Sequence, residues 1–131
     1  MQIVAQQKNV RQAPRKVRLV ANQVKKMDLQ MAVAQLGALE RRSSVVLLKV
    51  IRQAVGNAQK NHQLDVEDLA LSDIIVEDGA ILRRMRPVSR GRGHGIDKRT
   101  CHIKVVLDTK EKKQESRAAS AEQTTTDSKE K

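Results

Sequence analysis

Three segments of the chain place apolar residues at the spacing of an amphipathic helix. The first begins at Pro14, since proline suits the first helical position, and the second follows Asp28, whose side chain can cap a helix. The third follows Ser43 or Ser44, either of which can supply a cap, and is expected to end near Asn61. The apolar stripes are, in order, Val17, Val20, Ala21, Val24 and Met27; Leu29, Ala32, Val33, Leu36 and Leu39; and Leu47, Val50, Ile51, Ala54, Val55 and Ala58.

Three other segments carry the pattern of β-strands. Residues 2–7 form a short run with apolar side chains on one face, and residues 69–76 are rich in β-branched and aliphatic side chains. Asp78 and Gly79, which follow the second segment, indicate a bend or a bulge. The clearest alternation of apolar and polar residues is at 103–107, and it predicts the third strand.

A segment with almost no core-forming side chains, residues 83–99, lies between the last two strands. If the flanking strands continue into it as a hairpin, about eight residues per leg at ~3.3 Å each give a finger of ~26 Å. Because a lone two-stranded ribbon is marginally stable, we expect the finger to be mobile when free and ordered when embedded in polyanion. The pattern predicts an α+β fold, with three helices packed on a small three-stranded antiparallel sheet and a long protruding β-hairpin.

The composition changes at Thr109. Beyond it Ser, Thr, Gln, Lys and Glu dominate, and Leu, Ile and Val are absent. Such a segment cannot bury enough apolar surface to offset the entropy lost on ordering. We therefore expect one globular domain over residues 1–108 and a disordered polar C-terminal tail over residues 109–131.

The bulk composition points to a polyanionic partner. The chain of 131 residues has no Phe, Tyr or Trp, which excludes base stacking on aromatic rings and leaves arginine guanidinium planes for that purpose. Its net charge of +11 is self-repelling unless a polyanion neutralises it, and either nucleic acid or an anionic membrane surface would serve. No apolar run approaches the ~20 residues that span a bilayer, and no signal-peptide pattern is present. These features predict a nucleic-acid partner and no membrane partner. The single cysteine allows no disulfide within the chain and indicates a reducing compartment such as the cytosol.

The charge falls in three blocks along the chain. Residues 8–26 carry +7 with no acid, residues 61–82 carry −6 with no base, and residues 83–99 carry +6. A single run of charge is often only a solvated face, but two basic blocks separated by an acidic one predict one strongly positive end of the folded protein. The side chains expected to bind nucleic acid are Lys8, Arg11, Arg15, Lys16, Arg18, Lys25, Lys26, Arg83, Arg84, Arg86, Arg90, Arg92, Lys98 and Arg99.

The glycine-rich stretch at residues 90–95 is not a nucleotide-binding phosphate loop, because it lacks the Lys-Ser/Thr pair and the strand and helix that flank such a loop. Its alternating arginine and glycine suit close approach of the backbone to RNA, the alternative being a loop that only turns. Cys101 and His102 would point to opposite faces of a strand and could not share a metal ion. We interpret the carboxylates of residues 65–78, in or beside a loop, as keeping that surface soluble and free of RNA rather than as catalytic. The sequence thus predicts no enzyme, no metal, no cofactor and no small-molecule substrate.

Three motifs in order along the chain carry a family resemblance. Residues 13–21, Ala-Pro-Arg-Lys-Val-Arg-Leu-Val-Ala, are similar to the signature that opens the first helix of the universal large-subunit ribosomal protein twenty-two family, of bacterial or organellar type. Residues 54–61 resemble that family's Ala-x-x-Asn-Ala-x-x-Asn helix end. The most specific motif is Arg-Gly-Arg at 90–92 followed by Ile-Asp-Lys-Arg-Thr-Cys-His-Ile at 96–103.

The resemblance implies a globular domain on the outer surface of the large subunit and a hairpin, residues 81–100, that runs inward through ribosomal RNA. Arg15, Lys16 and Arg18 would contact RNA from the first helix. The implied partners are 23S-type large-subunit ribosomal RNA, neighbouring large-subunit proteins including protein four near the peptide exit tunnel, and the nascent peptide in passing. The hairpin tip that helps line the tunnel would comprise Val88, Ser89, Arg90, Gly91, Arg92, Gly93 and His94.

The implied function is that of a structural constituent of the large ribosomal subunit that also supports its assembly, in the cytoplasm or in an organellar ribosome. Because the family often has Ser where Ala13 stands, the first helix is expected to lack a side-chain cap. The alternative is a nucleoid-type architectural DNA-binding protein whose basic arm lies in a minor groove. Competition between duplex DNA and ribosomal RNA separates the two hypotheses.

Overall fold

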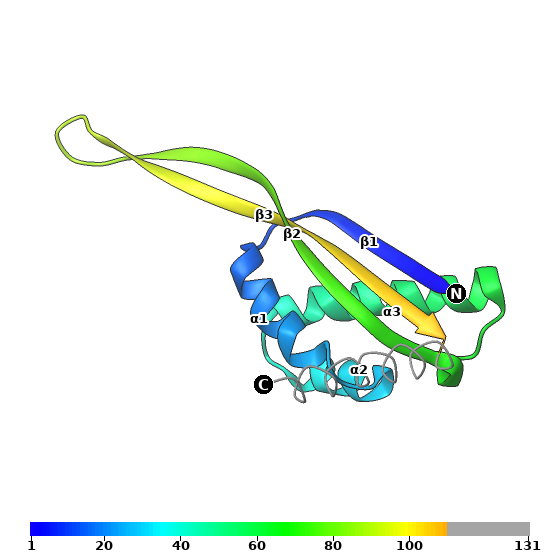
Figure 1. The fold of residues 1–131 in the computed structure, drawn as a ribbon. Helices are drawn as coiled ribbons and strands as arrows, with labels where there is room; N and C mark the ends of the chain where they lie inside the picture. The colour runs from blue at the N-terminus through cyan, green and yellow to red at the C-terminus, as the bar shows by residue number, and fades with distance from the viewer. Residues whose placement is uncertain (110–131) are drawn as a thin grey trace, which may run out of the picture.

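Three helices cover one face of a three-stranded sheet in the computed structural model, which describes residues 1–109 (Figure 1). The strands are β1 (Gln2–Val10), β2 (Leu69–Pro87) and β3 (Gly93–Thr109), and the helices are α1 (Pro14–Val24), α2 (Leu29–Ala38), α3 (Arg42–His62) and the short 3₁₀ helix η1 (Val66–Asp68). The central strand, β3, pairs antiparallel with both β1 and β2. The predicted α+β fold is confirmed, while the predicted tail lies outside the described residues except for Thr109, which belongs to β3.

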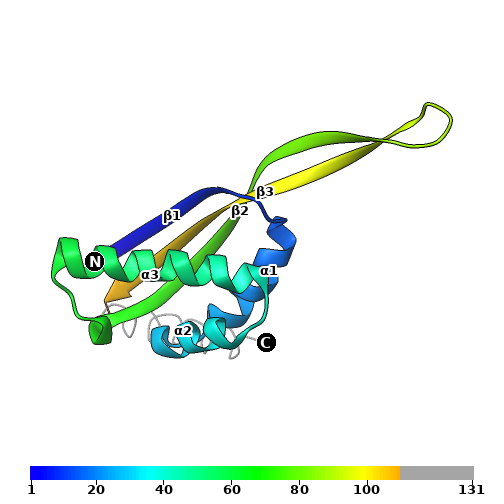
Figure 2. The same ribbon diagram turned by 180° about the vertical axis from the view of Figure 1, so that it is seen from behind.

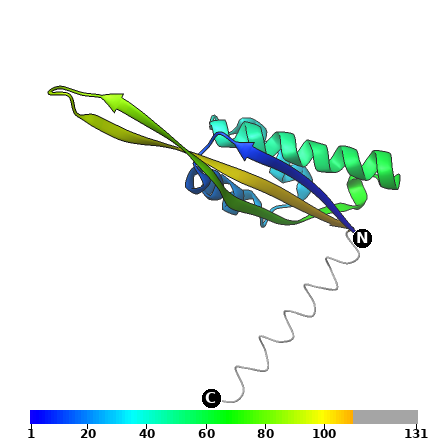
Figure 3. The same cartoon turned by 90° about the horizontal axis from the view of Figure 1, so that it is seen from above.

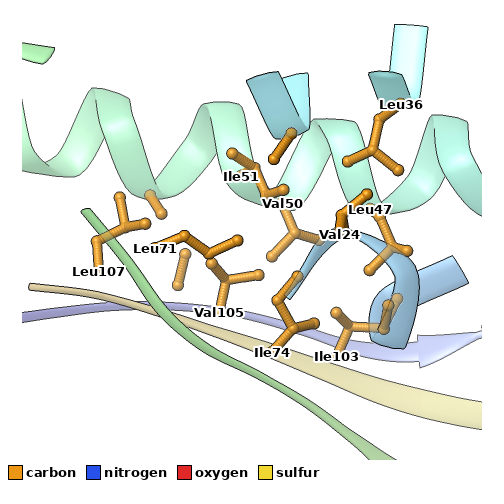
Figure 4. Close-up of a cluster of buried hydrophobic side chains, with 14 of the residues drawn as sticks. Val24, Leu36, Leu47, Val50, Ile51, Leu71, Ile74, Ile103, Val105 and Leu107 are labelled. Carbon is orange, nitrogen blue, oxygen red and sulfur yellow. The ribbon is translucent and has the colours of Figure 1, made fainter. Parts of the chain in front are cut away.

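The apolar stripes of the helices meet the sheet in a core made only of aliphatic side chains and one cysteine. The long helix α3 packs against β1 and β3, whereas α1 packs against β2 (Figure 2). Figure 4 shows Ile51 of α3 facing Leu71 and Val105 of the sheet, and Leu47 facing Ile74 and Ile103. The predicted stripes are therefore the buried faces, with Met27, Val33, Leu39 and Val55 half-buried at the edge of the core.

The predicted cap of α3 is wrong. The helix begins at Arg42, with Arg41 in the N-cap position, so both serines lie inside its first turn. The Oγ of Ser44 donates to the carbonyl oxygens of Leu39 (2.7 Å) and Arg41 (2.6 Å), which satisfies a hydroxyl that is completely buried. A side chain caps a helix from the N-cap position, which Arg41 occupies, so neither serine serves as the cap.

The ends of the other helices agree more closely with the positions predicted from the sequence. Asp28 occupies the N-cap position of α2 but makes no capping hydrogen bond, which corrects the prediction for its side chain. Ala13 is the N-cap residue of α1, and α1 has no side-chain cap, as expected. At the other end of α3, His62 is the last residue and Gln63 turns the chain with a left-handed φ of 52°.

A two-stranded hairpin extends beyond the sheet, as predicted for residues 81–100 (Figure 3). Its register runs over seven pairs, from Ile81 opposite Arg99 to Pro87 opposite Gly93. Seven residues per leg at ~3.3 Å each give a reach of ~23 Å. The helices lie beside the sheet and not beside the distal hairpin (Figure 3), so packing against helices does not stabilise this part.

A bulge in β2 marks the place where the hairpin leaves the sheet. The register shifts between Asp78 and Ile81, which confirms the bend predicted at Asp78 and Gly79. Thr100 lies opposite, and its Oγ1 donates to the carbonyl oxygen of Ala80 at 2.7 Å. A Cβ atom on Gly79 would come within 2.5 Å of that Oγ1 and 3.2 Å of the Thr100 carbonyl carbon, so the close approach of the two strands requires glycine.

Candidate nucleic-acid interface

A groove of about 980 Å³ lies at the base of the hairpin, where β2 and β3 leave the sheet beside the starts of α1 and α3. We call it the basic groove. Seven of its fourteen lining residues are basic, and one is acidic. The basic residues are Arg11, Lys16, Arg41, Arg42, Arg84, Lys98 and Arg99; the others are Asp97, Gln12, Ala13, Leu19, Ser43, Leu82 and Thr100. A surface with this excess of cations attracts a polyanion.

Two helix starts strengthen the positive potential of the basic groove. The N-cap residues Ala13 of α1 and Arg41 of α3 both line it, and neither helix has a side-chain cap or an acid in its first turn. The N–H groups of the first turn carry the positive end of the helix dipole, although Pro14 has no N–H and those of Lys16 and Ser44 donate to the carbonyl oxygens of Ala13 and Arg41. Backbone donors of this kind bind phosphate oxygens, so the groove combines mobile cationic side chains with fixed backbone donors.

The fourteen predicted nucleic-acid ligands fall into four groups in the structure. Five line the basic groove: Arg11, Lys16, Arg84, Lys98 and Arg99. Four lie on the hairpin outside the groove: Arg83, Arg86, Arg90 and Arg92. Three are exposed elsewhere on the domain: Lys8, Arg15 and Lys26. The remaining two, Arg18 and Lys25, form ion pairs within the protein.

Those ion pairs fasten α1 to the neighbouring strand β2. Arg18 Nη2 lies 2.7 Å from Asp78 Oδ1 while its Nε donates to the carbonyl oxygen of Val76 at 3.1 Å, and Lys25 Nζ lies 2.7 Å from Asp73 Oδ1. The expectation that the carboxylates of residues 65–78 lie in or beside a loop is wrong for these two, because they are part of β2. Two carboxylates of the acidic residues 61–82 therefore neutralise cations of α1 and the residue after it. A role of Arg18 or Lys25 in RNA binding stays a prediction.

Two basic residues of the groove, and Gln12, were not predicted from the sequence. Arg41 and Arg42 follow Glu40 and stand outside the two long basic blocks, so only the packing of α3 beside the hairpin brings them to the groove. Gln12 also lines it, and its amide nitrogen and oxygen are buried without a hydrogen-bond partner among the described residues. No pattern in the sequence separates these three from ordinary surface residues.

The hairpin tip is a tight turn. Arg90 and Gly91 both have positive φ, 62° and 69°, and the N–H of Arg92 donates to the carbonyl oxygen of Ser89 at 3.4 Å. Two positive φ values at the centre of a two-residue hairpin turn are typical of type I′, whose twist matches that of the strands. The outer bond, from the N–H of Val88 to the carbonyl oxygen of Arg92 at 2.9 Å, closes the loop. The turn places two arginines at the end of the hairpin.

The remaining titratable candidates lie apart from the groove. Cys101 is fully buried, and burial raises the pKa of its thiol; the Arg18 guanidinium opposes this rise and the Asp78 carboxylate adds to it. On the opposite face of β3, His102 Nδ1 accepts a hydrogen bond from the N–H of Asn9 at 3.0 Å. Within residues 1–109 no group of three His, Cys, Asp or Glu side chains is placed to hold a metal ion. No helix in that range has the length and apolarity needed to cross a membrane.

Comparison with known proteins identifies the family. The family model described as ribosomal protein L22p/L17e matches residues 5–108. The chain belongs to this family. It is also 43% identical, over 110 residues, to Large ribosomal subunit protein uL22 of Oceanobacillus iheyensis, and the alignment covers 84% of this chain and 97% of that protein. The resemblance inferred from the three motifs is thereby confirmed.

The match to the L22p/L17e family includes every residue that lines the basic groove. The groove therefore belongs to the part of the chain shared with the family. The family consists of ribosomal proteins and not of enzymes, which confirms the prediction that the chain has no enzymatic activity. It also favours the ribosomal hypothesis over the nucleoid-type alternative.

Proposed function

We propose that this chain is a structural protein of the large ribosomal subunit that binds 23S-type ribosomal RNA through the basic groove and the hairpin. The observation that carries the proposal is the continuity of the two surfaces. Arg84, Lys98 and Arg99 line the groove and also belong to the legs of the hairpin, whose tip adds Arg90 and Arg92. An RNA strand in the groove would therefore meet further cations as it follows the hairpin.

The hairpin is suited to a position inside folded RNA. It extends ~23 Å from the sheet at ~3.3 Å per residue, and its distal part is not packed against a helix of its own domain. RNA that surrounds it would neutralise its charge and order it, and it would in turn hold RNA segments together during assembly. On this proposal residues 88–94 help line the peptide exit tunnel near ribosomal protein four, and the nascent peptide passes them.

The relative's name supports the location in the large subunit, since it is a protein of that subunit. We infer that the globular domain contacts neighbouring proteins of the same subunit, in a cytoplasmic or an organellar ribosome. Residues 1–109, which include Thr109 of β3, would form the RNA-binding domain, and the polar residues 110–131 lie outside the described residues.

The salt dependence of binding tests the proposal. Binding of the full chain to large-subunit ribosomal RNA is measured over a range of salt concentrations for the wild type and for Arg42→Ala, Arg90→Ala and Arg92→Ala. Each variant should bind more weakly, and each should reduce the slope of log K against log salt by ~0.7–0.9, the loss of one phosphate contact.

Lys60→Ala is the matched control, because Lys60 is an exposed cation at the end of α3 remote from the hairpin. It should leave the slope almost unchanged. Slopes for the three arginine variants equal to that of the wild type would show that these side chains are not phosphate ligands. If duplex DNA competed with ribosomal RNA on equal terms, the nucleoid-type alternative would replace the proposal.

A further inference from the structure

The exposed face of α3 carries cations beyond those of the basic groove. Arg42, Lys49 and Arg52 are exposed, and steps of seven and three residues keep them on one side of a helix with 3.6 residues per turn. They span ~15 Å along the helix axis, at ~1.5 Å per residue. Neither ion pair within residues 1–109 involves α3, so these cations are available to an external anion. No other described element lies over this side of the helix, which faces the viewer in Figure 2.

The surroundings of α3 attract a polyanion. The elements β1, α1, α2 and α3 contain no Asp or Glu. Before residue 65 the chain has twelve Lys and Arg and only two acids, Asp28 and Glu40. The acidic side chains gather instead on η1 and on β2, which lies at the opposite edge of the sheet from β1. The helix α3 packs against β1 and β3, so its exposed face belongs to the basic side of the domain.

Gly56 keeps the same side of α3 open. It follows Arg52 by about one turn, and a Cβ atom there would meet nothing within 4 Å. Glycine destabilises the interior of a helix relative to alanine, and no contact among the described residues requires it at this position. The absence of a side chain does allow the backbone of a ligand to approach the helix closely. Gly56 therefore provides clearance next to the cations.

The chemistry of this face suits an RNA duplex. The surface of a helix is convex, and the chain has no aromatic rings on which unpaired bases could stack, so the cations of α3 are suited to phosphates. A duplex presents its phosphates in a fixed arrangement, whereas a single strand must first be ordered. Proteins recognise RNA duplexes mostly through phosphates and 2′-hydroxyl groups. Gln53, which is exposed beside Arg52 and Lys49, can donate to or accept from a 2′-hydroxyl that DNA lacks.

We propose that the exposed face of α3 is a second RNA-binding surface, on which Arg42, Lys49 and Arg52 hold the backbone of an RNA duplex. Arg42 also lines the basic groove, so this surface continues the groove along α3 and away from the hairpin. It ends before Lys60, which lies in the last turn of α3, because the acids of η1 follow that turn and repel phosphates. The inference rests on the proposed function, since it takes ribosomal RNA as the polyanion.

Binding to a duplex and to a single strand tests the inference. Affinities of the full chain for a labelled blunt RNA duplex and for labelled oligo-uridine are measured over a range of salt concentrations. The double variant Lys49→Ala/Arg52→Ala should reduce the slope of log K against log salt on the duplex by ~1.4–1.8, two contacts at ~0.7–0.9 each, and leave the slope on oligo-uridine unchanged. Lys60→Ala is the matched control and should change neither slope. A DNA duplex of the same sequence should bind the wild type more weakly than the RNA duplex.

Gly56→Gln tests the clearance without a change in charge. Glutamine is the better helix former, so thermal unfolding should show no loss of stability, whereas the longer side chain should weaken binding of the duplex. Gly37→Gln is the matched control, because Gly37 of α2 also has open space at its Cβ position. It should leave binding of the duplex unchanged.

The outcomes separate this inference from the proposed function. An unchanged duplex slope for the double variant, with the slopes of the hairpin variants as expected, would overturn the α3 surface and leave the proposed function in place. Equal losses on the duplex and on oligo-uridine would show only general attraction by charge and would also overturn it, as would equal binding of the DNA duplex. Wild-type duplex affinity of Gly56→Gln would contradict the close approach to α3. If the chain bound neither the duplex nor ribosomal RNA, both proposals would fail.

Discussion

Gly79 and Thr100 meet where the hairpin leaves the sheet, and their contact leaves no room for a methyl group. We predict that Gly79→Ala lowers the free energy of unfolding by ~1–3 kcal/mol, because the new Cβ would overlap Thr100 Oγ1 and crowd the backbone behind it. Urea unfolding of the isolated protein measures the change.

Gly56→Ala provides the comparison. Gly56 lies inside α3, and a Cβ there meets nothing within 4 Å. Alanine has the higher helix propensity, so this variant should be more stable than the wild type by ~0.5–1 kcal/mol. Similar effects of the two substitutions would contradict the close approach of the strands at Gly79.

At the scale of single residues, the sequence predicted the core but not the hydrogen bonds. The period of a helix places Leu47 and Ile51 on one face whatever the tertiary contacts are. Their burial in the core could therefore be predicted from the sequence. Ser44 could equally have capped a helix or bound the carbonyls before it, and only the position of Leu39 and Arg41 decides between these. Alternatives of this kind differ by too little free energy for a local pattern to separate them.

The N-terminus of α1 can be stabilised by a substitution at its N-cap position. Ala13 has extended backbone angles, φ −68° and ψ 131°, which suit an N-cap residue, but its side chain has no acceptor. We predict that Ala13→Ser raises the free energy of unfolding by ~1 kcal/mol, because the hydroxyl can accept from a free N–H of the first turn. Thermal and urea unfolding of the isolated protein would reveal the gain.

Ala13→Val, which adds bulk but no acceptor, is the control and should give no gain. The serine should also compete with phosphate for the same N–H groups, so Ala13→Ser should not strengthen RNA binding. A serine variant as stable as the wild type would mean that water already satisfies these donors.

The existence of each helix and strand could be predicted from the sequence. The residues at which they end, and the elements against which they pack, were harder to predict. The alternation at residues 103–107 and the stripe of α3 both persist over several residues, and both elements are present as expected. The basic groove was not predicted, because its walls come from segments around residues 11–19, 41–43 and 82–100 that are far apart in the chain. Charge counting along the sequence identified two of these segments and passed over Arg41 and Arg42.

The whole molecule consists of a packed domain and a hairpin that depends on its surroundings. We predict that trypsin cleaves free protein within residues 81–100 before it cleaves at Lys49 or Arg52 of α3, because opening the distal hairpin exposes no core. Mass spectrometry of early fragments identifies the sites. Large-subunit ribosomal RNA should protect the hairpin and leave the order of the other cuts unchanged.

Poly-glutamate serves as a control for charge alone: a simple polyanion should protect the hairpin less than folded RNA does. Early cleavage in α3 ahead of the hairpin would contradict the division into a stable domain and a marginal ribbon. Equal protection by the two polymers would show that neutralisation of charge suffices, without RNA structure.

The uninterrupted course of β3 from Gly93 to Thr109 restricts how the length of the hairpin can change in evolution or by design. Successive residues of a strand point to opposite faces, so removing one residue from each leg would exchange the two faces of everything nearer the tip. Removing two from each leg keeps the faces and shortens the hairpin by ~7 Å. Hairpin lengths that preserve the chemistry of both faces therefore differ by multiples of ~7 Å. Intermediate lengths require a new bulge.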